Sequence, residues 1–312
     1  EVMLIMLGGL YGAGKKYTSV IYHNYAITKA NSGDTDGSLR ALATALQLDP
    51  QDRYYRTGAL INLAQLNQLV NAGNSDTDAQ NKFQTLLASA LQNTARALQT
   101  NNASFQNWMT RGLVYETVVP LNIDGAFENA VAVYEQARVL NPQDPEIDWR
   151  LANMHRTQGD IESARASIDT ALRKKADYTN AILLRAQIEL DAGNLEKAVE
   201  SVRNAIFFEP QNSVLLYQLG ILLLQDTSYT QAAQAFEVAL QQTPNFANAS
   251  FFLAQSYAFL GRYDDAAALM SSLIADNAEN TLLVEYRDTL TQGVNPFVSA
   301  PVPPTEDEEV IE

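Results

Sequence analysis

GAFENAVAVYEQARVLNP, at residues 125–142, begins a pattern that the chain repeats every 34 residues. The later copies are GDIESARASIDTALRKKA (159–176), GNLEKAVESVRNAIFFEP (193–210), TSYTQAAQAFEVALQQTP (227–244) and GRYDDAAALMSSLIADNA (261–278). In each copy an alanine is followed four residues later by an apolar residue, and three residues after that by Ala or Leu. Because these three positions share one face of an α-helix, each copy predicts a helix that buries that face.

The ends of each copy predict turns. Four copies begin with glycine and one begins with Thr227, at the place where the chain leaves a preceding helix. Glycine is favoured there because such turns often need a positive φ angle. Pro142, Pro210 and Pro244 end the second helix and open the next unit. Each unit is therefore predicted to be helix, tight turn and helix, and stacked neighbours bury the faces that one unit leaves exposed.

The first helix of each unit carries a second recurring pair. Leu-Ala or Leu-Gly occupies three equivalent positions, and Arg185 departs from the pattern in a fourth. The three pairs are Leu151-Ala152, Leu219-Gly220 and Leu253-Ala254. With the alanines and prolines in register, the chain resembles the tetratricopeptide repeat (TPR) family. The resemblance implies an all-α fold, a right-handed superhelical solenoid of about seven helix-turn-helix units with an apolar N-terminal helix extension and a C-terminal capping helix.

The repeat frame predicts three regions. Residues 1–18 form an apolar N-terminal helical segment, which can run into the first unit without a break. Residues 19–292 form the solenoid, with regular repeats over 111–280. Residues 293–312 form a Pro-rich acidic tail, whose composition is typical of disordered or extended chain. The helices predicted outside the regular array lie near residues 19–31, 37–48, 53–69, 78–99 and 279–291.

The composition argues against several classes of function. The 312 residues contain no cysteine and only two histidines, His23 and His155, which excludes disulfide frameworks, thiol catalysis and Cys/His metal sites. A net charge of −15 makes nucleic acid an unfavourable partner. No nucleophile stands in a catalytic pattern, and the paired carboxylates fall on exposed helix faces. We therefore expect no enzymatic activity and no cofactor.

Two motif-like stretches are explained better without a ligand. GLYGAGK resembles a phosphate-binding loop, but Lys16 follows it where Ser or Thr has to bind magnesium. The run from Asn74 to Asp78 resembles the start of a calcium loop, but Ala79 replaces the required glycine. We expect Thr77 or Asp78 to cap the following helix instead.

The TPR resemblance also predicts where a ligand binds. In that family the fifth and ninth positions of each first helix point into a concave groove. The fifth positions here are Trp149, Leu183, Tyr217 and Phe251. The ninth positions are Asn153, Gln187, Ile221 and Gln255. An apolar stripe rimmed by amides suits an apolar helix or an extended peptide, although these side chains can instead pack between units.

One TPR specificity is disfavoured by the sequence. The family's carboxylate clamp, which binds peptide C-termini, uses Lys at the fifth position and Asn at the ninth position of one helix. Asn153 matches this pattern, but Trp149 replaces the Lys. We therefore do not expect a clamp, although the chain itself ends in EEVIE (308–312).

The N-terminal segment is apolar and lies outside the repeat frame. Residues 2–13 are too few to span a bilayer, which needs about 20 residues. The segment is either the end of a longer transmembrane helix or an apolar segment exposed by processing and buried against protein. The residues predicted to mediate self-assembly are Leu4, Ile5, Leu7, Gly8, Leu10, Tyr11 and Gly12. Inserted into the groove of the next molecule, the segment makes a heterologous contact that generates a ring or a filament.

The C-terminal tail is expected to bind at the same contact between two copies of the chain. Its acidic side chains suit the basic residues of the middle repeats. These are Arg150, Arg156, Arg173, Lys174 and Lys175.

A second resemblance rests on the apolar segment, Lys15, Lys16 and the junction DPQDRYY (49–55). These features are similar to the C-terminal region of large multi-pass O-antigen ligase-like membrane proteins of candidate-phyla bacteria. The catalytic residues of that family lie in a membrane domain outside this region. The resemblance implies that this chain is the soluble interaction domain of a longer precursor, either released or anchored to the membrane.

Together these features predict a non-enzymatic TPR scaffold for protein–protein interaction. The expected partner is a protein or peptide, above all further copies of the chain in an extracellular or cell-surface filament. The alternatives are a monomeric adaptor, or the interaction domain of a membrane O-antigen ligase-like enzyme with its repeats in solution. Membrane contact is expected only through residues 1–14.

Overall fold

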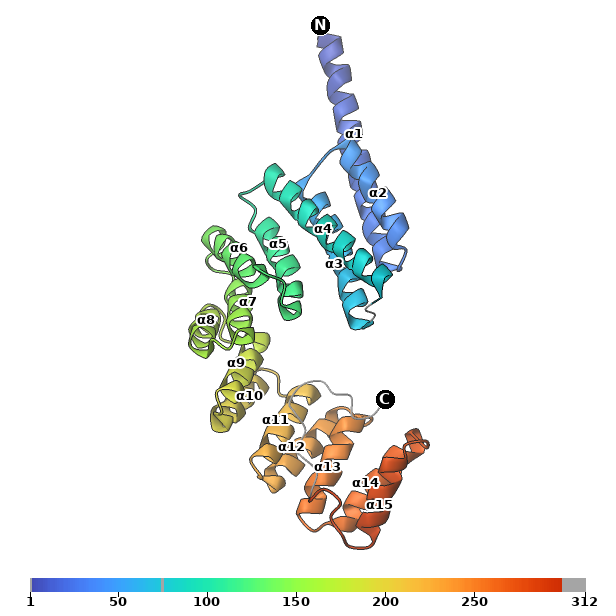
Figure 1. Cartoon of the computed structure of the whole chain (residues 1–312), viewed down its shortest axis with the longest axis vertical. Coiled ribbons are helices and arrows are strands. Elements are labelled where there is room, and N and C mark those ends of the chain that lie inside the picture. Colours follow the sequence, from blue (N-terminus) through green and yellow to red (C-terminus); the bar gives the residue numbers. More distant parts are fainter. Residues whose placement is uncertain (1, 74–75, 299–312) are drawn as a thin grey trace. The chain divides into compact units, whose positions relative to one another are not determined.

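The computed structural model describes residues 2–73 and 76–298, and only the backbone of residues 2–10 and 276. In this part of the chain helices follow one another without a strand, which confirms the predicted all-α fold (Figure 1). The helices are α1 (Val2–Asn31), α2 (Thr35–Leu48), α3 (Asp52–Asn71), α4 (Thr77–Thr100), α5 (Phe105–Val118), the 3-10 helix η1 (Val119–Leu121), α6 (Ala126–Leu140), α7 (Pro145–Thr157), α8 (Ile161–Lys174), α9 (Thr179–Asp191), α10 (Leu195–Phe208), α11 (Ser213–Gln225), α12 (Tyr229–Gln242), α13 (Ala247–Phe259), α14 (Tyr263–Asp276) and α15 (Thr281–Thr291).

The chain divides into two compact units, Glu1–Asp160 (unit 1) and Ile161–Glu312 (unit 2). In unit 1, α1 packs against α2, α3 against α4, and α5 against α6. In unit 2, α9 packs against α10, α11 against α12, and α13 against α14, which also contacts α15. These neighbours in sequence are the helix pairs that the 34-residue frame predicts.

The predicted helix face forms the core of both units. The alanines that open the pattern are completely buried, and the apolar residues four positions later are at most 2% exposed. The alanines are Ala130, Ala164, Ala198, Ala232 and Ala266. The apolar residues are Tyr134, Ile168, Val202, Phe236 and Met270. Their burial confirms the interpretation of the repeat.

Two glycines let neighbouring helices approach closely. A Cβ atom on Gly112 of α5 would lie 2.3 Å from the ring of Tyr134 on α6. The equivalent atom on Gly220 of α11 would lie 2.5 Å from the ring of Phe236 on α12. Both distances are far below van der Waals contact, so each crossing requires a residue without a side chain.

The turns inside the helix pairs follow one geometry. In the turn at Gly193 (φ 75°), the backbone N–H of Asn194 donates to the carbonyl of Glu189 at 2.7 Å. Thr227 keeps the same turn at φ 57°, and Ser228 donates to the carbonyl of Leu223 at 2.9 Å. Because Thr is β-branched, this left-handed conformation is strained.

Two expectations concern helices outside the regular array, namely the continuity of α1 and the N-cap of α4. α1 runs unbroken through 30 residues, as the sequence allowed. The expected cap of α4 is wrong: Asp76, not Thr77 or Asp78, accepts a hydrogen bond from the backbone N–H of Ala79 at 2.7 Å. Capping therefore accounts for Asp76 in the run that resembled a calcium loop, whereas Asn74 lies outside the described residues.

Candidate functional site

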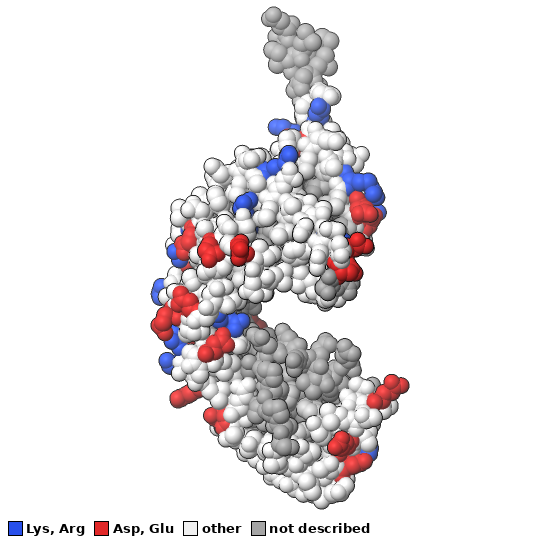
Figure 2. Space-filling view, viewed as in Figure 1, with Lys and Arg blue, Asp and Glu red and all other residues white. Residues whose placement is uncertain are grey.

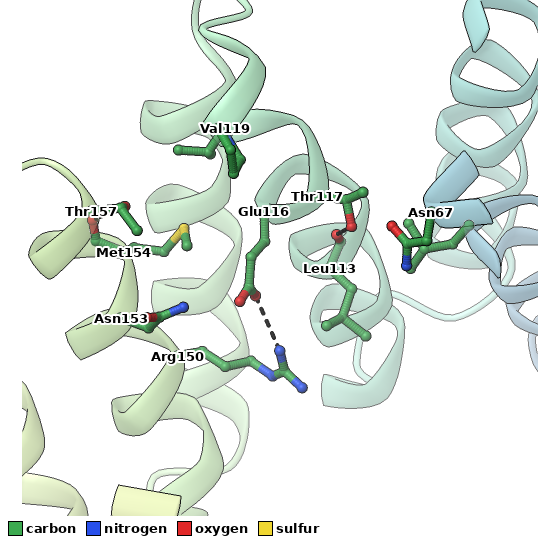
Figure 3. A pocket seen from close by; sticks show the side chains of 11 residues that line it. Asn67, Leu113, Glu116, Thr117, Val119, Arg150, Asn153, Met154 and Thr157 are labelled. Atoms are coloured by element: carbon green, nitrogen blue, oxygen red, sulfur yellow. Dashed lines mark hydrogen bonds and ion pairs between the residues drawn. The ribbon is translucent and has the colours of Figure 1, made fainter. Parts of the chain in front are cut away.

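A recess of about 380 Å³ opens in unit 1 between α3, α5, η1 and α7; we call it the α7 recess (Figure 3). Its apolar lining consists of Leu63, Leu113, Val119, Pro120 and Met154. Its polar lining consists of Asn67, Glu116, Thr117, Arg150, Asn153 and Thr157. The volume is within the range of small ligand sites and suits one or two side chains of a bound segment.

Helical spacing brings these side chains to one place. On α7 the lining residues follow one another at intervals of three and four, from Arg150 through Asn153 to Thr157. Leu113 and Thr117 are four residues apart on α5, and Leu63 and Asn67 are four apart on α3. The start of α7 is fixed by Asp144, whose carboxylate accepts from the backbone N–H of Glu146 at 3.0 Å. The walls formed by α3, α5 and α7 are therefore each one face of a regular helix.

The floor of the recess contains the ion pair of Arg150 and Glu116 (Figure 3), which belongs to a larger ionic network. The Arg150 guanidinium donates to Glu116 at 3.1 Å and to Glu146 at 2.7 Å. The Tyr134 hydroxyl also donates to Glu116. Two carboxylates thus share one guanidinium, so the floor carries a surplus of negative charge and Arg150 is held in place.

Burial and charge determine the protonation of this network. Burial alone lowers the pKa of Arg150, but Tyr134, Glu116 and Glu146 raise it by more, so its pKa lies above the ordinary value. Burial and the neighbouring Glu116 raise the pKa of Tyr134 well above its ordinary range. Arg150 therefore stays charged, and the Tyr134 phenol stays protonated as a hydrogen-bond donor.

Two amides of the recess are available to a ligand. Among the described residues, neither the Asn153 side chain on α7 nor the Asn67 side chain on α3 has a hydrogen-bond partner. An amide both donates and accepts hydrogen bonds, which matches the backbone of an extended peptide.

The predicted groove residues have different environments. Trp149 on α7 is half-buried and lies outside the lining of the recess, with the Arg150 guanidinium 5.2 Å from its ring centroid. In unit 2, Leu183, Gln187 and Tyr217 are half-buried. Ile221, Phe251 and Gln255 are buried. Of the eight predicted positions, only Asn153 lines the recess.

The sequence interpretation did not identify Glu116, Asn67 or the role of Arg150 at this site. Glu116 and Asn67 lie before the regular array, where no 34-residue register pointed to them. The available signal was the spacing of polar and apolar residues on α5 and α3, but it does not reveal which helices share a recess.

The N-terminal self-assembly segment is only partly described. Leu4, Ile5, Leu7, Gly8 and Leu10 belong to α1, but their side chains lie outside the described residues. Tyr11 is 68% exposed, and a Cβ atom on Gly12 would meet nothing within 4 Å. The tail beyond residue 298 also lies outside the described residues, so its expected contact with the basic residues stays a prediction.

Two further kinds of site are absent from the described residues. None of the helices there has the length and apolar character that crossing a bilayer requires. Nor do three or more His, Asp or Glu side chains come together in that part of the chain as a group able to hold a metal ion.

Comparison with protein families gives a direct match. A family model described as "Tetratricopeptide repeat" matches residues 121–188 and 223–284. A second model with the same description matches residues 183–245, so the matches together cover 121–284.

Three curated proteins are similar over part of their length. The BBSome complex member BBS4 of Bos taurus is 32% identical over 120 residues, which is 38% of this chain and 23% of that protein. Protein O-mannosyl-transferase TMTC1 of Homo sapiens is 22% identical over 59% of this chain and 22% of its own length. The peroxisomal targeting signal receptor of Saccharomyces cerevisiae is 27% identical over 32% of this chain and 18% of its own length. The chain thus spans less than a quarter of each relative.

Solved structures share the fold. Yeast Tom70 superposes with a TM-score of 0.57 at 18% identity, covering 90% of this chain and 55% of its own. A tetratricopeptide repeat protein from Parabacteroides merdae superposes with a TM-score of 0.54 at 16% identity, covering 88% and 99%. The expected likeness to O-antigen ligase-like proteins stays a prediction. The helix pairs, the glycine turns and the family matches agree: this chain belongs to the tetratricopeptide repeat family.

Proposed function

We propose that this protein is a non-enzymatic interaction scaffold that binds an extended peptide segment of a partner protein in the α7 recess. The observation that carries the proposal is the pair of amides, Asn67 and Asn153, which line the α7 recess without partners among the described residues. TPR repeats are protein-interaction modules, and one relative of this chain is named as a targeting signal receptor. Both facts support a peptide ligand.

The chemistry of the recess indicates the kind of peptide. Leu113 and Met154 contact an apolar side chain, while the two amides pair with the peptide backbone. Arg150 is held by two carboxylates, so it is a poor receptor for the C-terminal carboxylate of a ligand. The net charge of −15 attracts basic segments. In Figure 2, basic side chains on the visible face are scattered among acidic and uncharged ones. We therefore expect an internal, apolar segment with basic flanks.

Selection from a random peptide library displayed on phage, with the wild-type chain as bait, tests this proposal. The affinity of the enriched peptides is then measured by fluorescence anisotropy. Asn153→Ala and Asn67→Ala should each weaken binding about tenfold, because each removes a hydrogen bond to the ligand. Gln187→Ala, at the ninth position of α9 in unit 2, is the matched control and should bind like the wild type. Equal binding by all four proteins, or no enrichment, would contradict the proposal.

The length of α1 favours a second candidate function, self-assembly. α1 has 30 residues and its partner α2 has 14. Tyr11 and Tyr17 of α1 are 68% and 71% exposed. In this proposal the apolar N-terminus of one copy docks into a neighbouring copy. That heterologous contact builds a ring or an open filament, with an extracellular or cell-surface polymer as the expected form.

Negative-stain microscopy and light scattering test self-assembly. The wild type is expected to form regular polymers, and deletion of residues 1–14 should abolish them. Tyr11→Ser and Tyr17→Ser together are a milder variant that leaves the helix in place. A monomeric wild type would exclude self-assembly and leave the adaptor function. Binding of the wild type to phosphatidylglycerol vesicles without polymers would assign the segment to a membrane surface instead.

A further inference from the structure

One side of α1 holds this helix in unit 1. Ser19, His23 and Ala26 are buried on that side at intervals of four and three residues. The Ser19 hydroxyl lies 3.0 Å from the Tyr54 hydroxyl of α3, and the Ser38 hydroxyl of α2 donates to the carbonyl of Ala26 at 2.6 Å. The other sides of α1 are exposed, and the start of the helix extends past α2 (Figure 1).

A second side of α1 carries tyrosines and lysines; we call it the α1 face. Its residues follow one another at intervals of three and four and therefore share one side of the helix: Lys15, Thr18, Tyr22, Tyr25 and Lys29. Tyr22 and Tyr25 are 39% and 50% exposed, and the Lys29 ammonium lies 5.5 Å from the Tyr25 ring centroid. A row of exposed aromatic and basic side chains is typical of an interaction surface.

The α1 face is positive although the chain is acidic. α1 contains Lys15, Lys16 and Lys29 and no Asp or Glu, whereas the net charge of the chain is −15. Lys29 pairs with Asp34 at 2.9 Å. No carboxylate of the described residues pairs with Lys15 or Lys16, so these two lysines are available to an acidic ligand.

Residues 299–312, SAPVPPTEDEEVIE, have the complementary chemistry. They lie outside the described residues, and their sequence contains three prolines and five acidic residues but no Lys or Arg. Proline-rich segments favour the extended polyproline conformation, which protein surfaces recognise with exposed aromatic rings. In that conformation residues 301–308 would span about 22 Å, close to the roughly 21 Å that α1 rises from Lys15 to Lys29.

We propose that the α1 face is a docking surface for residues 299–312 of a second copy of the chain. The rings of Tyr22 and Tyr25 contact the prolines, and Lys15 and Lys16 pair with the acidic residues that follow. In the middle repeats, by contrast, the Arg150 guanidinium is already shared by two carboxylates. The contact uses residues 15–29 of α1, so it goes beyond self-assembly through residues 1–14.

The probe is a fluorescein-labelled, C-terminally amidated peptide with the sequence of residues 299–312. The receptor is the full-length chain whose own tail is neutralised by Glu306→Gln, Asp307→Asn, Glu308→Gln and Glu309→Gln, so that it does not compete. Anisotropy titrations should show saturable binding of the peptide. Adding Lys15→Gln and Lys16→Gln, or Tyr22→Gln and Tyr25→Gln, should weaken binding at least about tenfold, because the charges or the rings are lost.

The matched control adds Lys174→Gln and Lys175→Gln to the same receptor. It removes the same charge from the middle repeats and should leave the affinity unchanged. Circular dichroism establishes that each variant is folded. No saturable binding, or an equal loss of affinity in the control, would overturn the proposal.

Sedimentation equilibrium tests whether the bound segment comes from a second copy. At concentrations above the Kd of the peptide, the average mass of the wild type should exceed that of the chain with Lys15→Gln and Lys16→Gln. Equal masses would overturn the contact between copies. Both chains retain residues 1–14, so failure of this contact and failure of self-assembly through the N-terminus are separate results.

Discussion

The first helices α7 and α13 offer the same repeat positions to very different surroundings. On α7 the fifth and ninth residues, Trp149 and Asn153, are half-buried, and Asn153 lines an open recess. On α13 the corresponding Phe251 and Gln255 are buried, and Phe251 lies against the ring of Phe297. The position in the repeat determines the direction in which a side chain projects. The residues that pack over that side chain determine whether it is accessible.

The same comparison separates polar from apolar surroundings. The α7 recess has an ionic floor in which Arg150 contacts Glu116 and Glu146. The surroundings of Phe251 on α13 are instead aromatic rings, those of Tyr286 and Phe297. Equivalent repeat positions thus acquire surroundings of different chemistry through exchange of a few side chains.

The largest expected effect comes from truncating the buried position. Phe251→Ala should lower the free energy of unfolding by about 3–5 kcal/mol, because the ring contacts Phe252, Tyr286 and Phe297 and its loss leaves a cavity. Asn153→Ala should change it by less than about 0.5 kcal/mol, as is usual for surface residues.

The two tryptophans make it possible to assign the destabilisation by Phe251→Ala to one of the two units. Trp108 and Trp149 both lie in unit 1, so tryptophan fluorescence reports that unit while circular dichroism reports the whole chain. In urea titrations Phe251→Ala should shift the dichroism midpoint more than the fluorescence midpoint. The opposite order would show that Phe251 does not stabilise unit 2.

Overpacking the two close helix crossings tests the α7 recess with a matched pair. Gly112→Ala and Gly220→Ala should each cost about 2 kcal/mol, since the new methyl groups meet the rings of Tyr134 and Phe236. Only Gly112→Ala displaces Tyr134 and, through it, Glu116 in the α7 recess. It should therefore also weaken the selected peptides, whereas Gly220→Ala should leave their affinity unchanged. Equal losses of affinity would place the ligand elsewhere.

The response to pH should also differ between the units. His23 packs 4.5 Å from the Tyr54 ring and is hydrogen-bonded to Thr57 at 2.8 Å. Burial, and then Arg53 and Arg56, lower the pKa of His23 below 6.5. The folded state thus binds fewer protons than the unfolded chain. Its stability is complete above about pH 6.5 and is lost as the pH falls through the folded-state pKa.

Unit 2 contains no histidine in its sequence, and its acid response begins lower. Hydrogen bonding from Arg165 lowers the pKa of Glu189 below 4.5, so that contribution is lost only as the pH falls below this value. Urea titrations at pH 7.5 and 5.5 should show a lower fluorescence midpoint at pH 5.5, and His23→Gln should reduce the difference. An unchanged difference in the variant would rule out His23 as the source.

The smallest effect is expected at an exposed ion pair. Arg262 and Asp265 are 2.7 Å apart at i and i+3, with side chains 47% and 54% exposed. Asp265→Ala should leave the free energy of unfolding almost unchanged, because solvent screens such pairs. Thermal unfolding followed by dichroism measures this change. A larger loss would show that this pair, unlike most surface pairs, contributes to unit 2 as strongly as packing does.

Much of the fold was predictable because the residues that recur every 34 positions are the residues of the buried core. Ala130 and Tyr134 lie at the periodic positions, and periodicity alone showed that they share a buried face. The α7 recess was less predictable, since Glu116 and Asn67 lie outside the regular array and meet α7 only in the folded unit. Phe297 could not be anticipated either. The Pro-rich composition around it indicated extended chain, and composition does not reveal one aromatic contact.

Thr227 gives the chain a place to open first. The left-handed turn costs a β-branched residue about 1 kcal/mol, and this cost is recovered when the turn between α11 and α12 opens. Local opening there is therefore roughly fivefold more frequent than at the equivalent glycine turns of Gly193 and Gly261. We expect amide hydrogens beside Thr227 to exchange with solvent sooner than those beside Gly193 and Gly261, and limited proteolysis should cut this turn before theirs. A repeat array of nearly equal units thus acquires an order of disassembly from one side chain.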